Sequence, residues 1–158
     1  MEAWVYRFPI GEIMIAAEDG AITDIRFGGE LPHEAKPLET PLIKRCQEEL
    51  REYFSGERQA FDLPLAPQGT AFQQSVWQAL LTIPYGEVRS YGDIARQIGN
   101  PKASRAIGGA NNRNPIAIVI PCHRVIGANG RLVGYGGGLD KKEMLLSLEQ
   151  QVLEEKTC

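Results

Sequence analysis

The sequence predicts a mixed α/β (α+β) protein: a small N-terminal antiparallel sheet with one helix, then a mostly helical half with a helix-turn-helix and an active-site cysteine. Short apolar segments with strand-type patterns fill the first 27 residues. Apolar positions with helical spacing recur from residue 40 onwards. The stretch 61–69, marked by Pro64, Pro67 and Gly69, is the best candidate linker. We therefore expect two domains, at residues 1–66 and 67–158.

The first domain begins with three predicted strands, at residues 4–8, 13–17 and 21–27, whose side chains alternate or run apolar. The break before the third contains Asp19-Gly20, a dipeptide typical of tight β-hairpins. We therefore expect a three-stranded antiparallel meander. The aromatic residues of this half are expected in its core: Trp4, Tyr6, Phe8, Phe27 and Phe54.

A helix is expected after a polar loop at residues 28–39. Thr40 is suited to its N-cap, because the hydroxyl can accept a bond from a free first-turn amide, and Pro41 fits the first helical position. Gly56 ends the helix. Cys46 lies on the apolar stripe, and we interpret it as core packing.

The second domain is predicted to begin with three helices. The first spans residues 71–83 behind a threonine cap, and a Ser-x-x-Asp capping box at residues 90–93 opens the second. Gly99 ends the second helix, and Asn100-Pro101 is expected to cap the third, which runs to about residue 111. Two short helices joined by a Gly-Asn-Pro turn make a helix-turn-helix.

The charge distribution marks this helix-turn-helix as a candidate polyanion site. The net charge is -3, but residues 1–85 carry 7 Lys or Arg against 13 Asp or Glu, and residues 86–145 carry 9 against 4. The interval between Asp93 and Asp140 contains no acidic residue. Its basic residues are Arg96, Lys102, Arg105, Arg113, Arg124 and Arg131. A solvated basic face is the common alternative, but the small residues of the third helix would let it press closely against a groove.

The most informative stretch runs from residue 114 to residue 126. We interpret the β-branched run 116–120 as a short buried strand that Pro121 ends. Cys122 would then lie at the rim of a core, and the adjacent His123 could help to form a thiolate. An isolated Cys-His pair is more often a small apolar cysteine that finishes a strand, so the assignment depends on the basic segment beside it.

A glycine-rich segment and a helix complete the chain. Residues 127–138 enclose Tyr135 among glycines, which indicates either close approach to a ligand or a flexible surface loop. Asp140 is expected to cap the final helix. The inward positions expected for this helix are Met144, Leu145, Leu148 and Val152. Glu149 borders the apolar face, where a carboxylate needs a partner, and His123 could be that partner.

Composition and cysteine usage exclude several classes of protein. The chain of 158 residues has no apolar run near the roughly 20 residues of a membrane span, and its start lacks a signal-peptide pattern. Its three cysteines, Cys46, Cys122 and Cys158, are odd in number and scattered, which favours a reducing cytoplasm over a disulfide framework. With two histidines and no Cys-x-x-Cys pair, the sequence has no recognisable zinc site, and we expect no metal. We also expect no cofactor and no membrane partner. A monomer is expected, because no helix shows a spare apolar face.

Residues 72–149 resemble the O6-alkylguanine-DNA alkyltransferase family (methylated-DNA–protein-cysteine S-methyltransferases). The features that carry the resemblance are Asn114-Pro115, Pro121-Cys122-His123-Arg124-Val125, Tyr135 and Gly137-Gly138-Leu139. The N-terminal half resembles the family in general layout, which there is a ribonuclease-H-like domain. The resemblance implies repair of double-stranded DNA by irreversible transfer of the alkyl group of O6-alkylguanine to Cys122, with O4-alkylthymine as a further candidate lesion.

The resemblance also implies a role for each catalytic residue. Cys122 would accept the alkyl group, and His123, acting through a water, would remove its proton. Glu149 would hold and polarise His123, as in a Ser-His-Asp relay with sulfur as the nucleophile. Asn114 would brace the turn that carries the cysteine. Tyr135 would donate a hydrogen bond toward guanine O6 as guanine becomes the leaving group.

For DNA binding, the resemblance places the third helix in the minor groove, with the target base flipped out. Arg105 would fill the vacated space, and Tyr91 would push on the 3′ phosphate. The further DNA contacts implied are Lys102, Ser104, Ala106, Gly108 and Arg124. The carbonyl of Val125 would accept from the guanine amine. The other residues implied in the alkylguanine pocket are Ala117, Tyr135 and Gly136.

Three positions depart from the pattern of some family members. Ala117 stands where a proline often lies in the pocket wall, which predicts room for larger alkyl groups. Asn111 replaces an apolar residue that packs at the DNA face, and Gly136 replaces a serine that can contact O6. Three other functions remain as alternatives: a lesion-recognition module without chemistry, a cysteine hydrolase, and a helix-turn-helix regulator. The last two leave either the basic segment or the Cys-His-Glu set without a role.

Overall fold

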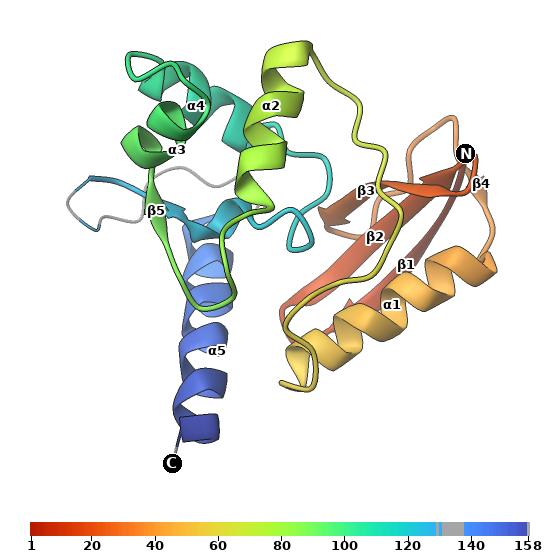
Figure 1. The fold of residues 1–158 in the computed structure, drawn as a ribbon. Coiled ribbons are helices and arrows are strands. Elements are labelled where there is room, and N and C mark those ends of the chain that lie inside the picture. The colour runs from red at the N-terminus through yellow and green to blue at the C-terminus, as the bar shows by residue number, and fades with distance from the viewer. Residues whose placement is uncertain (129, 131–137, 158) are drawn as a thin grey trace. The chain divides into compact units, whose positions relative to one another are not determined.

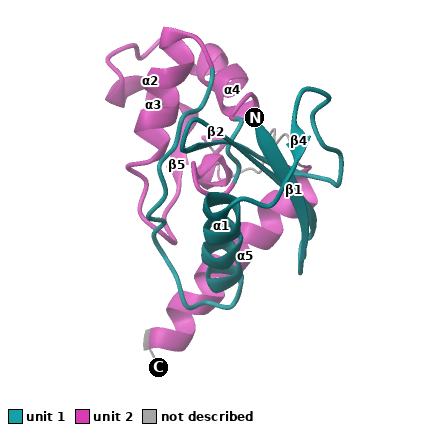
Figure 2. Cartoon of the chain, turned by 90° about the vertical axis from the view of Figure 1, so that its right-hand side faces the viewer, with its two compact units in different colours: residues 1–68, 115–117 teal, residues 69–114, 118–158 magenta. Residues whose placement is uncertain are grey.

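The computed structural model describes residues 1–128, 130 and 138–157. The chain forms two compact units, one made of residues 1–68 with 115–117 and the other of residues 69–114 with 118–158 (Figure 2). No helix among the described residues is both long and apolar enough to cross a bilayer.

The first unit is built on a sheet with the strand order β3-β2-β1-β4 (Figure 1). The predicted meander is confirmed, because β1 (Glu2–Phe8), β2 (Gly11–Glu18) and β3 (Ala21–Phe27) pair antiparallel. Asp19 and Gly20 form the turn between β2 and β3, both with positive φ. A fourth strand, β4 (Lys36–Pro37), pairs parallel with β1, so the prediction of a continuous loop at residues 28–39 is wrong.

Two segments distant in sequence cover the outer edge of β3. Ile22 forms a parallel bridge with Leu65, and Ile25 forms one with Ile116. The amide of Ala117 donates to the carbonyl of Ile25 at 3.0 Å. An open edge strand leaves backbone donors and acceptors without partners, and these bridges satisfy part of that edge.

Helix α1 (Pro41–Phe54) packs against this sheet and begins as predicted. The Thr40 hydroxyl accepts a first-turn amide at 3.2 Å, and Gly56 follows the helix end with φ 83°. The apolar stripe is fully buried at Ile43, Cys46, Leu50 and Tyr53, which confirms Cys46 as core packing. The expectation of a core position for Trp4 is wrong: its side chain is 39% exposed, because it points to the face opposite that of the buried Ala3.

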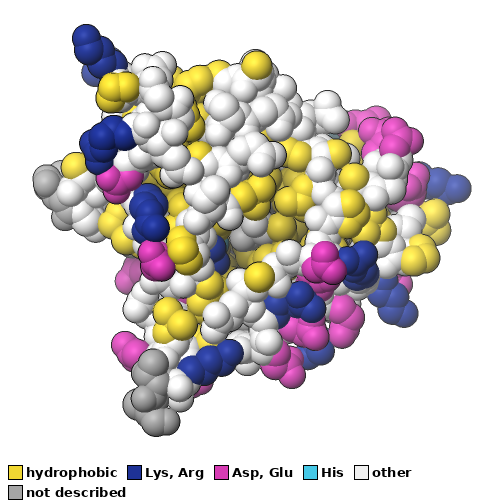
Figure 3. Space-filling model, in the orientation of Figure 1, with side chains coloured by type: hydrophobic (Ala, Val, Ile, Leu, Met, Phe, Trp, Pro, Cys, Tyr) yellow, Lys and Arg dark blue, Asp and Glu magenta, His cyan; other side chains and the backbone are white. Residues whose placement is uncertain are grey.

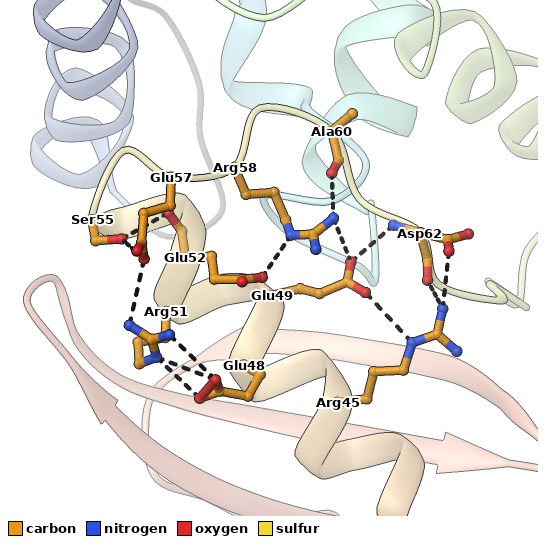
Figure 4. A network of polar contacts seen from close by, with 10 residues as sticks. All are labelled: Arg45, Glu48, Glu49, Arg51, Glu52, Ser55, Glu57, Arg58, Ala60 and Asp62. Atoms are coloured by element: carbon orange, nitrogen blue, oxygen red, sulfur yellow. Dashed lines mark hydrogen bonds and ion pairs between the residues drawn. The ribbon is translucent and has the colours of Figure 1, made fainter.

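The other side of α1 carries a network of ion pairs with both signs of charge interspersed (Figure 4). Glu49 is only 5% exposed and accepts the amide of Asp62 at 2.8 Å. Arg45 and Arg58 lie 3.5 Å from its two carboxylate oxygens. These contacts fix the chain after α1 to the helix, and none of them involves a reactive group.

The second unit is mostly helical. Its helices are α2 (Ala71–Leu80), α3 (Tyr91–Gln97), α4 (Ser104–Asn112) and α5 (Leu139–Thr157). Thr70 and Ser90 cap α2 and α3 as predicted, each within a capping box. Trp77 of α2 is 1% exposed, and its indole N–H donates to the carbonyl of Ala110 in α4 at 2.9 Å. This bond ties the helix-turn-helix to the core of the unit.

Two predicted helix ends in this unit are wrong. Helix α4 begins at Ser104, because the amide of Ala103 donates to the carbonyl of Asn100 and closes a separate turn first. Lys102 therefore lies in that turn, and no side chain caps α4. Helix α2 ends at Leu80 and not near residue 83, because the amides of Thr82 and Ile83 donate to carbonyls three residues earlier and not four.

Residues 116–120 are buried as expected, but they do not form the predicted strand. Ile116 makes one bridge, and a turn follows it. Ile118 has φ 72°, which is a strained conformation for a β-branched residue. Two short parallel strands that were not predicted, β5 (Arg89–Ser90) and β6 (Val125–Ile126), lie on either side of the cysteine segment in the sequence.

Helix α5 begins at Leu139, one residue before the expected cap Asp140. Leu145 and Val152 are buried as predicted, but Met144 is 48% exposed, so its predicted inward position is wrong. Helical geometry explains this difference, because adjacent residues lie 100° apart and Leu145 already occupies the inward direction.

Candidate active site

Cys122 opens a short 3₁₀ helix, η1 (Cys122–Arg124), at the end of the buried turn. Its amide donates to the carbonyl of Ile120 at 2.8 Å, and the amide of Arg124 donates to the carbonyl of Pro121 at 3.0 Å. With three residues per turn, the side chains of Cys122, His123 and Arg124 leave the backbone in three different directions. One short helix can therefore place a thiol, an imidazole and a guanidinium in separate surroundings.

Two asparagine side chains hold the backbone of this helix. Asn114 Nδ2 donates to the carbonyl of Ile120 at 2.8 Å, which agrees with a bracing role for Asn114. Asn111 Nδ2 donates to the carbonyl of Cys122 at 3.3 Å. Asn111 was expected at the DNA face, where some family members have an apolar residue. Its side chain is only 2% exposed and therefore lies inside the second unit.

The structure brings His123, Arg124 and Glu149 together in the interior. His123 Nε2 lies 2.6 Å from Glu149 Oε2, and both residues are 0% exposed. Arg124 binds the same carboxylate through two nitrogens, at 2.9 Å and 3.1 Å, and its third nitrogen donates to the carbonyl of Ile83 at 2.8 Å. The amide of Gly86 gives the carboxylate a further bond at 3.0 Å.

These contacts decide the protonation of the cluster. Burial tends to raise the pKa of Glu149, but the hydrogen bonds and charges of His123 and Arg124 outweigh burial and lower that pKa to about 2. Burial lowers the pKa of His123, against the opposing influence of Glu149. The carboxylate is therefore ionised and the imidazole neutral near pH 7.

The neutral imidazole has one tautomer that fits these surroundings. Nε2 must carry the proton that it donates to the Glu149 carboxylate, so Nδ1 carries the lone pair. Nδ1 is buried and has no hydrogen-bond partner among the described residues. His123 is therefore arranged as a proton acceptor with an orienting carboxylate behind it.

Most residues expected to contact DNA lie on the exposed face of the helix-turn-helix. Lys102, Ser104, Arg105 and Ala106 are exposed, and Gly108 is half-buried. On the face drawn in Figure 3, some Lys and Arg side chains lie at the left, over the region of α3 and β5, and others lie at the right among Asp and Glu side chains. Arg96, at the end of α3, pairs with Asp93, the nearest acidic residue.

Two residues of the expected DNA surface have internal contacts. Arg124 is 6% exposed and bound to Glu149, with its guanidinium 5.5 Å from the centre of the Tyr85 ring. The predicted DNA contact of Arg124 is wrong, because its donors are directed to internal acceptors. Tyr91 is half-buried and is hydrogen-bonded to Asn111, and burial raises the pKa of its hydroxyl.

The residues expected around the alkyl group fall in three places. Val125 is fully buried in β6, directly after η1. Ala117 is 9% exposed and belongs to the first unit, next to β3. Tyr135, Gly136 and the basic Arg131 lie outside the described residues.

One buried charge is not among the site residues predicted from the sequence. Lys142 of α5 is 0% exposed. Its spacing of seven residues from Glu149 places it on the same face of the helix, two turns away. That spacing is visible in the sequence and could have identified it.

Comparisons with known proteins agree with this arrangement. Residues 3–67 match the family model described as the ribonuclease-like domain of 6-O-methylguanine DNA methyltransferase, and residues 71–151 match the DNA-binding domain of the same protein. A methylated-DNA–protein-cysteine methyltransferase of Methanosarcina acetivorans is 52% identical over 153 residues, covering 92% of this chain and 96% of the relative. One from Mycolicibacterium paratuberculosis is 52% identical over 146 residues, covering 90% of this chain and 88% of its own.

Solved structures give the same result. The crystal structure of Mycobacterium tuberculosis OGT in complex with DNA has a TM-score of 0.90 and 47% identity, covering 96% of this chain and 94% of that one. An O6-methylguanine DNA methyltransferase from Methanococcus jannaschii has a TM-score of 0.69 and 26% identity, covering 92% of each chain.

Proposed function

Since this chain belongs to the 6-O-methylguanine DNA methyltransferase family, we propose that it repairs DNA by transferring the alkyl group of O6-alkylguanine to its own Cys122. The observation that carries the proposal is a buried pair in which Nε2 of His123, the residue after the cysteine, lies 2.6 Å from Oε2 of Glu149. A structural cysteine at the end of a turn would not need a neutral imidazole and an ionised carboxylate placed beside it.

The transfer is a displacement at the alkyl carbon. His123 Nδ1 takes the proton of Cys122, through a water, and the sulfur attacks the carbon. A carbon–sulfur bond forms, the carbon–O6 bond breaks, and its electron pair goes to the guanine. The proton removed from the thiol balances the charge of the departing guanine. Glu149 stabilises the imidazolium while it carries that proton.

The product explains why each molecule acts once. A thioether is stable, and the reaction as written supplies no second nucleophile to cleave it. Cys122 is therefore consumed, and the protein reacts stoichiometrically without a cofactor.

DNA binding through α4 is supported by its two consecutive glycines. A Cβ at Gly109 would meet nothing within 4 Å, and one at Gly108 would meet Tyr91 at an ordinary 3.9 Å. Neither glycine has a positive φ, and each costs a helix roughly 0.5–1 kcal/mol relative to alanine. The protein's own packing therefore does not require them. Close approach of a partner to the helix backbone, as by a DNA minor groove, would explain why these two positions carry no side chain.

The target base must leave the duplex for its alkyl carbon to reach a thiol that is 5% exposed. Arg105 is exposed on α4 and would occupy the space that the base vacates. Tyr91 would push on the 3′ phosphate while its bond to Asn111 connects it to the backbone of Cys122. Tyr135 and Val125 would bind the flipped base, as the family resemblance implies.

The experiment that tests the function is intact mass spectrometry after incubation with a duplex that contains one O6-methylguanine. We expect a gain of one methyl group on Cys122, saturating at one per protein, and no gain in Cys122→Ser. Tight lesion binding without any mass change would refute transfer and favour the lesion-recognition alternative. Repeating the assay with O4-methylthymine and O6-benzylguanine defines the substrate range, for which Ala117 predicts acceptance of the benzyl group. Size measurement by light scattering tests the expected monomer.

A further inference from the structure

Asn111 is a buried polar residue of α4 whose side-chain amide is only partly satisfied. It is 2% exposed, and its Oδ1 has no hydrogen-bond partner among the described residues. Leaving a buried acceptor unpaired is unfavourable, and a leucine of similar volume would fill the same space without that penalty. Packing of the second unit therefore does not require an asparagine here, and the two N–H groups of the amide are expected to have a function.

One of these N–H groups holds the backbone of the nucleophile. Nδ2 of Asn111 donates to the carbonyl oxygen of Cys122 at 3.3 Å. The same oxygen accepts the amide of Val125, which closes the turn of η1. A peptide carbonyl has two lone pairs, and these two bonds use both of them. The orientation of the peptide group of Cys122 therefore depends on where the Asn111 amide lies.

The second neighbour of the Asn111 amide is Tyr91, the first residue of α3, which packs against α4 (Figure 1). Gly108 and Asn111 are three residues apart and share one face of α4. The Tyr91 ring lies along this face, with its Cε1 atom 3.9 Å from the position that a Cβ at Gly108 would occupy. The Tyr91 hydroxyl is hydrogen-bonded to Asn111, one turn further along the helix. Because Oδ1 takes no part in this bond, the amide donates its second N–H to the phenolic oxygen.

The Asn111 amide is thus a bridge between the helix-turn-helix and the nucleophile. One hydrogen of the planar NH₂ group is directed to Tyr91 and the other to the carbonyl of Cys122. A second connection runs through the backbone, since Ser90, which precedes Tyr91, pairs with Ile126 after η1. A displacement of Tyr91 therefore changes contacts on both sides of the cysteine.

We propose that Asn111 is a positioning residue that couples the contact between Tyr91 and the DNA phosphate to the placement of Cys122 for attack. When the 3′ phosphate of the lesion fixes the Tyr91 hydroxyl, the amide and the Cys122 carbonyl are fixed with it. Attack is sensitive to such placement, since a shift of about 1 Å can slow a reaction by about 100-fold. The inference deepens the proposed function and rests on Cys122 being the reacting group and on Tyr91 contacting DNA.

The test is a double-variant cycle on the rate of methyl transfer, measured in a single turnover with a saturating duplex that contains one O6-methylguanine. Tyr91→Phe removes only the hydroxyl, and Asn111→Leu removes both donors at similar size. Each should slow transfer about tenfold or more, and the double variant should be no slower than the slower single variant, because both break the same bridge. The matched control is Asn112→Leu, which removes the same amide from an exposed position of α4 and should leave the rate at saturating DNA unchanged.

A reaction without DNA separates coupling from simple support of the turn. Methylation of Cys122 by iodomethane, followed by mass spectrometry of the peptide that carries it, involves no phosphate. Asn111→Leu should therefore leave the rate of this reaction unchanged. The proposal is overturned if this rate falls as much as the rate with DNA, if the double variant is slowed by the product of the two single effects, or if folded Asn111→Leu transfers at the wild-type rate.

A further measurement needs neither DNA nor a variant at Asn111. In protein labelled with ¹⁵N-asparagine and ¹³C′-cysteine, Tyr91→Phe should shift the NMR signals of both the Asn111 side-chain amide and the Cys122 carbonyl. An unchanged carbonyl signal would contradict the bridge. A wild-type protein that transfers no methyl group would instead refute the proposed function, so the two failures are distinguishable.

Discussion

Replacing Glu149 by glutamine separates the electrostatics of the buried cluster from its shape. The substitution keeps the size of the side chain but removes the charge that His123 and Arg124 share. Arg124, at 6% exposed, is then left as a buried cation without its carboxylate. We expect Glu149→Gln to destabilise the second unit and to slow alkyl transfer.

The structure gives the expected magnitude in two ways. Lowering the pKa of Glu149 from its ordinary 4.5 to about 2 corresponds to roughly 3 kcal/mol of stability. Removing one partner of a buried ion pair typically costs about 3–5 kcal/mol. The two estimates agree, so we expect a loss of about 3 kcal/mol at pH 7. Transfer from O6-methylguanine should slow by about 10²- to 10⁴-fold, because the imidazole loses its orienting carboxylate.

Urea denaturation measures the stability change. In a Trp4→Phe background, fluorescence reports Trp77, which is buried in the second unit. The Glu149 carboxyl has a lowered pKa, so its contribution is fully present above about pH 4.5 and is lost as the pH falls toward 2. The difference between wild type and Glu149→Gln should therefore be about 1 kcal/mol smaller at pH 3.5 than at pH 7. A difference below about 1 kcal/mol at pH 7, or one independent of pH, would refute the reasoning.

A double variant provides the control. Adding Arg124→Met to Glu149→Gln removes the uncompensated cation and should recover part of the lost stability. It should not restore alkyl transfer, because His123 still lacks the carboxylate. If transfer recovers together with stability, Glu149 acts only through folding.

Three further substitutions test the DNA surface and the backbone. Gly109→Ala should stabilise the protein by roughly 0.5–1 kcal/mol in thermal unfolding, since the added Cβ meets open space in the protein. The same Cβ should weaken duplex binding measured by fluorescence anisotropy, and unchanged binding would rule out close approach of DNA at Gly109. Arg105→Ala should reduce the rate of alkyl transfer from duplex DNA about tenfold or more but leave the titration midpoint of the Cys122 thiol, followed by NMR, unchanged. Equal transfer rates in the variant and the wild type would contradict a role for Arg105 in base flipping. Gly86→Ala should cost about 1–3 kcal/mol in urea denaturation, because Gly86 has φ 80° and its Cβ would lie 2.1 Å from Leu153; wild-type stability would show that the site relaxes freely.

Local signals in the sequence predicted the parts of the fold that local physics controls. The Asp-Gly turn, the Thr40 and Ser90 caps and the apolar stripe of α1 each depend on residues within a few positions of one another, and each is confirmed. The run 116–120 failed for the opposite reason. Its β-branched composition predicts a strand, but the turn depends on the bridge from Ile116 to β3 and on the bond from Asn114 to Ile120, which no local pattern encodes.

The same distinction applies to the site. The order Cys-His-Arg and the position of Glu149 could be recognised in the sequence, whereas the direction of each side chain could not. Arg124 appeared to be one more member of a basic DNA-binding segment, although three residues per turn in η1 direct it inward to Glu149. The burial of Lys142 could not be predicted either, because it depends on which face of α5 packs on the core.

Helix α5 explains why the nucleophile and its base can lie next to each other in the sequence. Adjacent residues of a 3₁₀ helix diverge, so Cys122 and His123 cannot be served by one stabilising group. The neighbouring helix α5 presents one face that repeats every 3–4 residues, and Glu149 on this face makes the imidazole a neutral acceptor. Moving that charge by one position along α5 would turn it away from this face by 100°, so the position of Glu149 on the helix is itself a requirement of the mechanism.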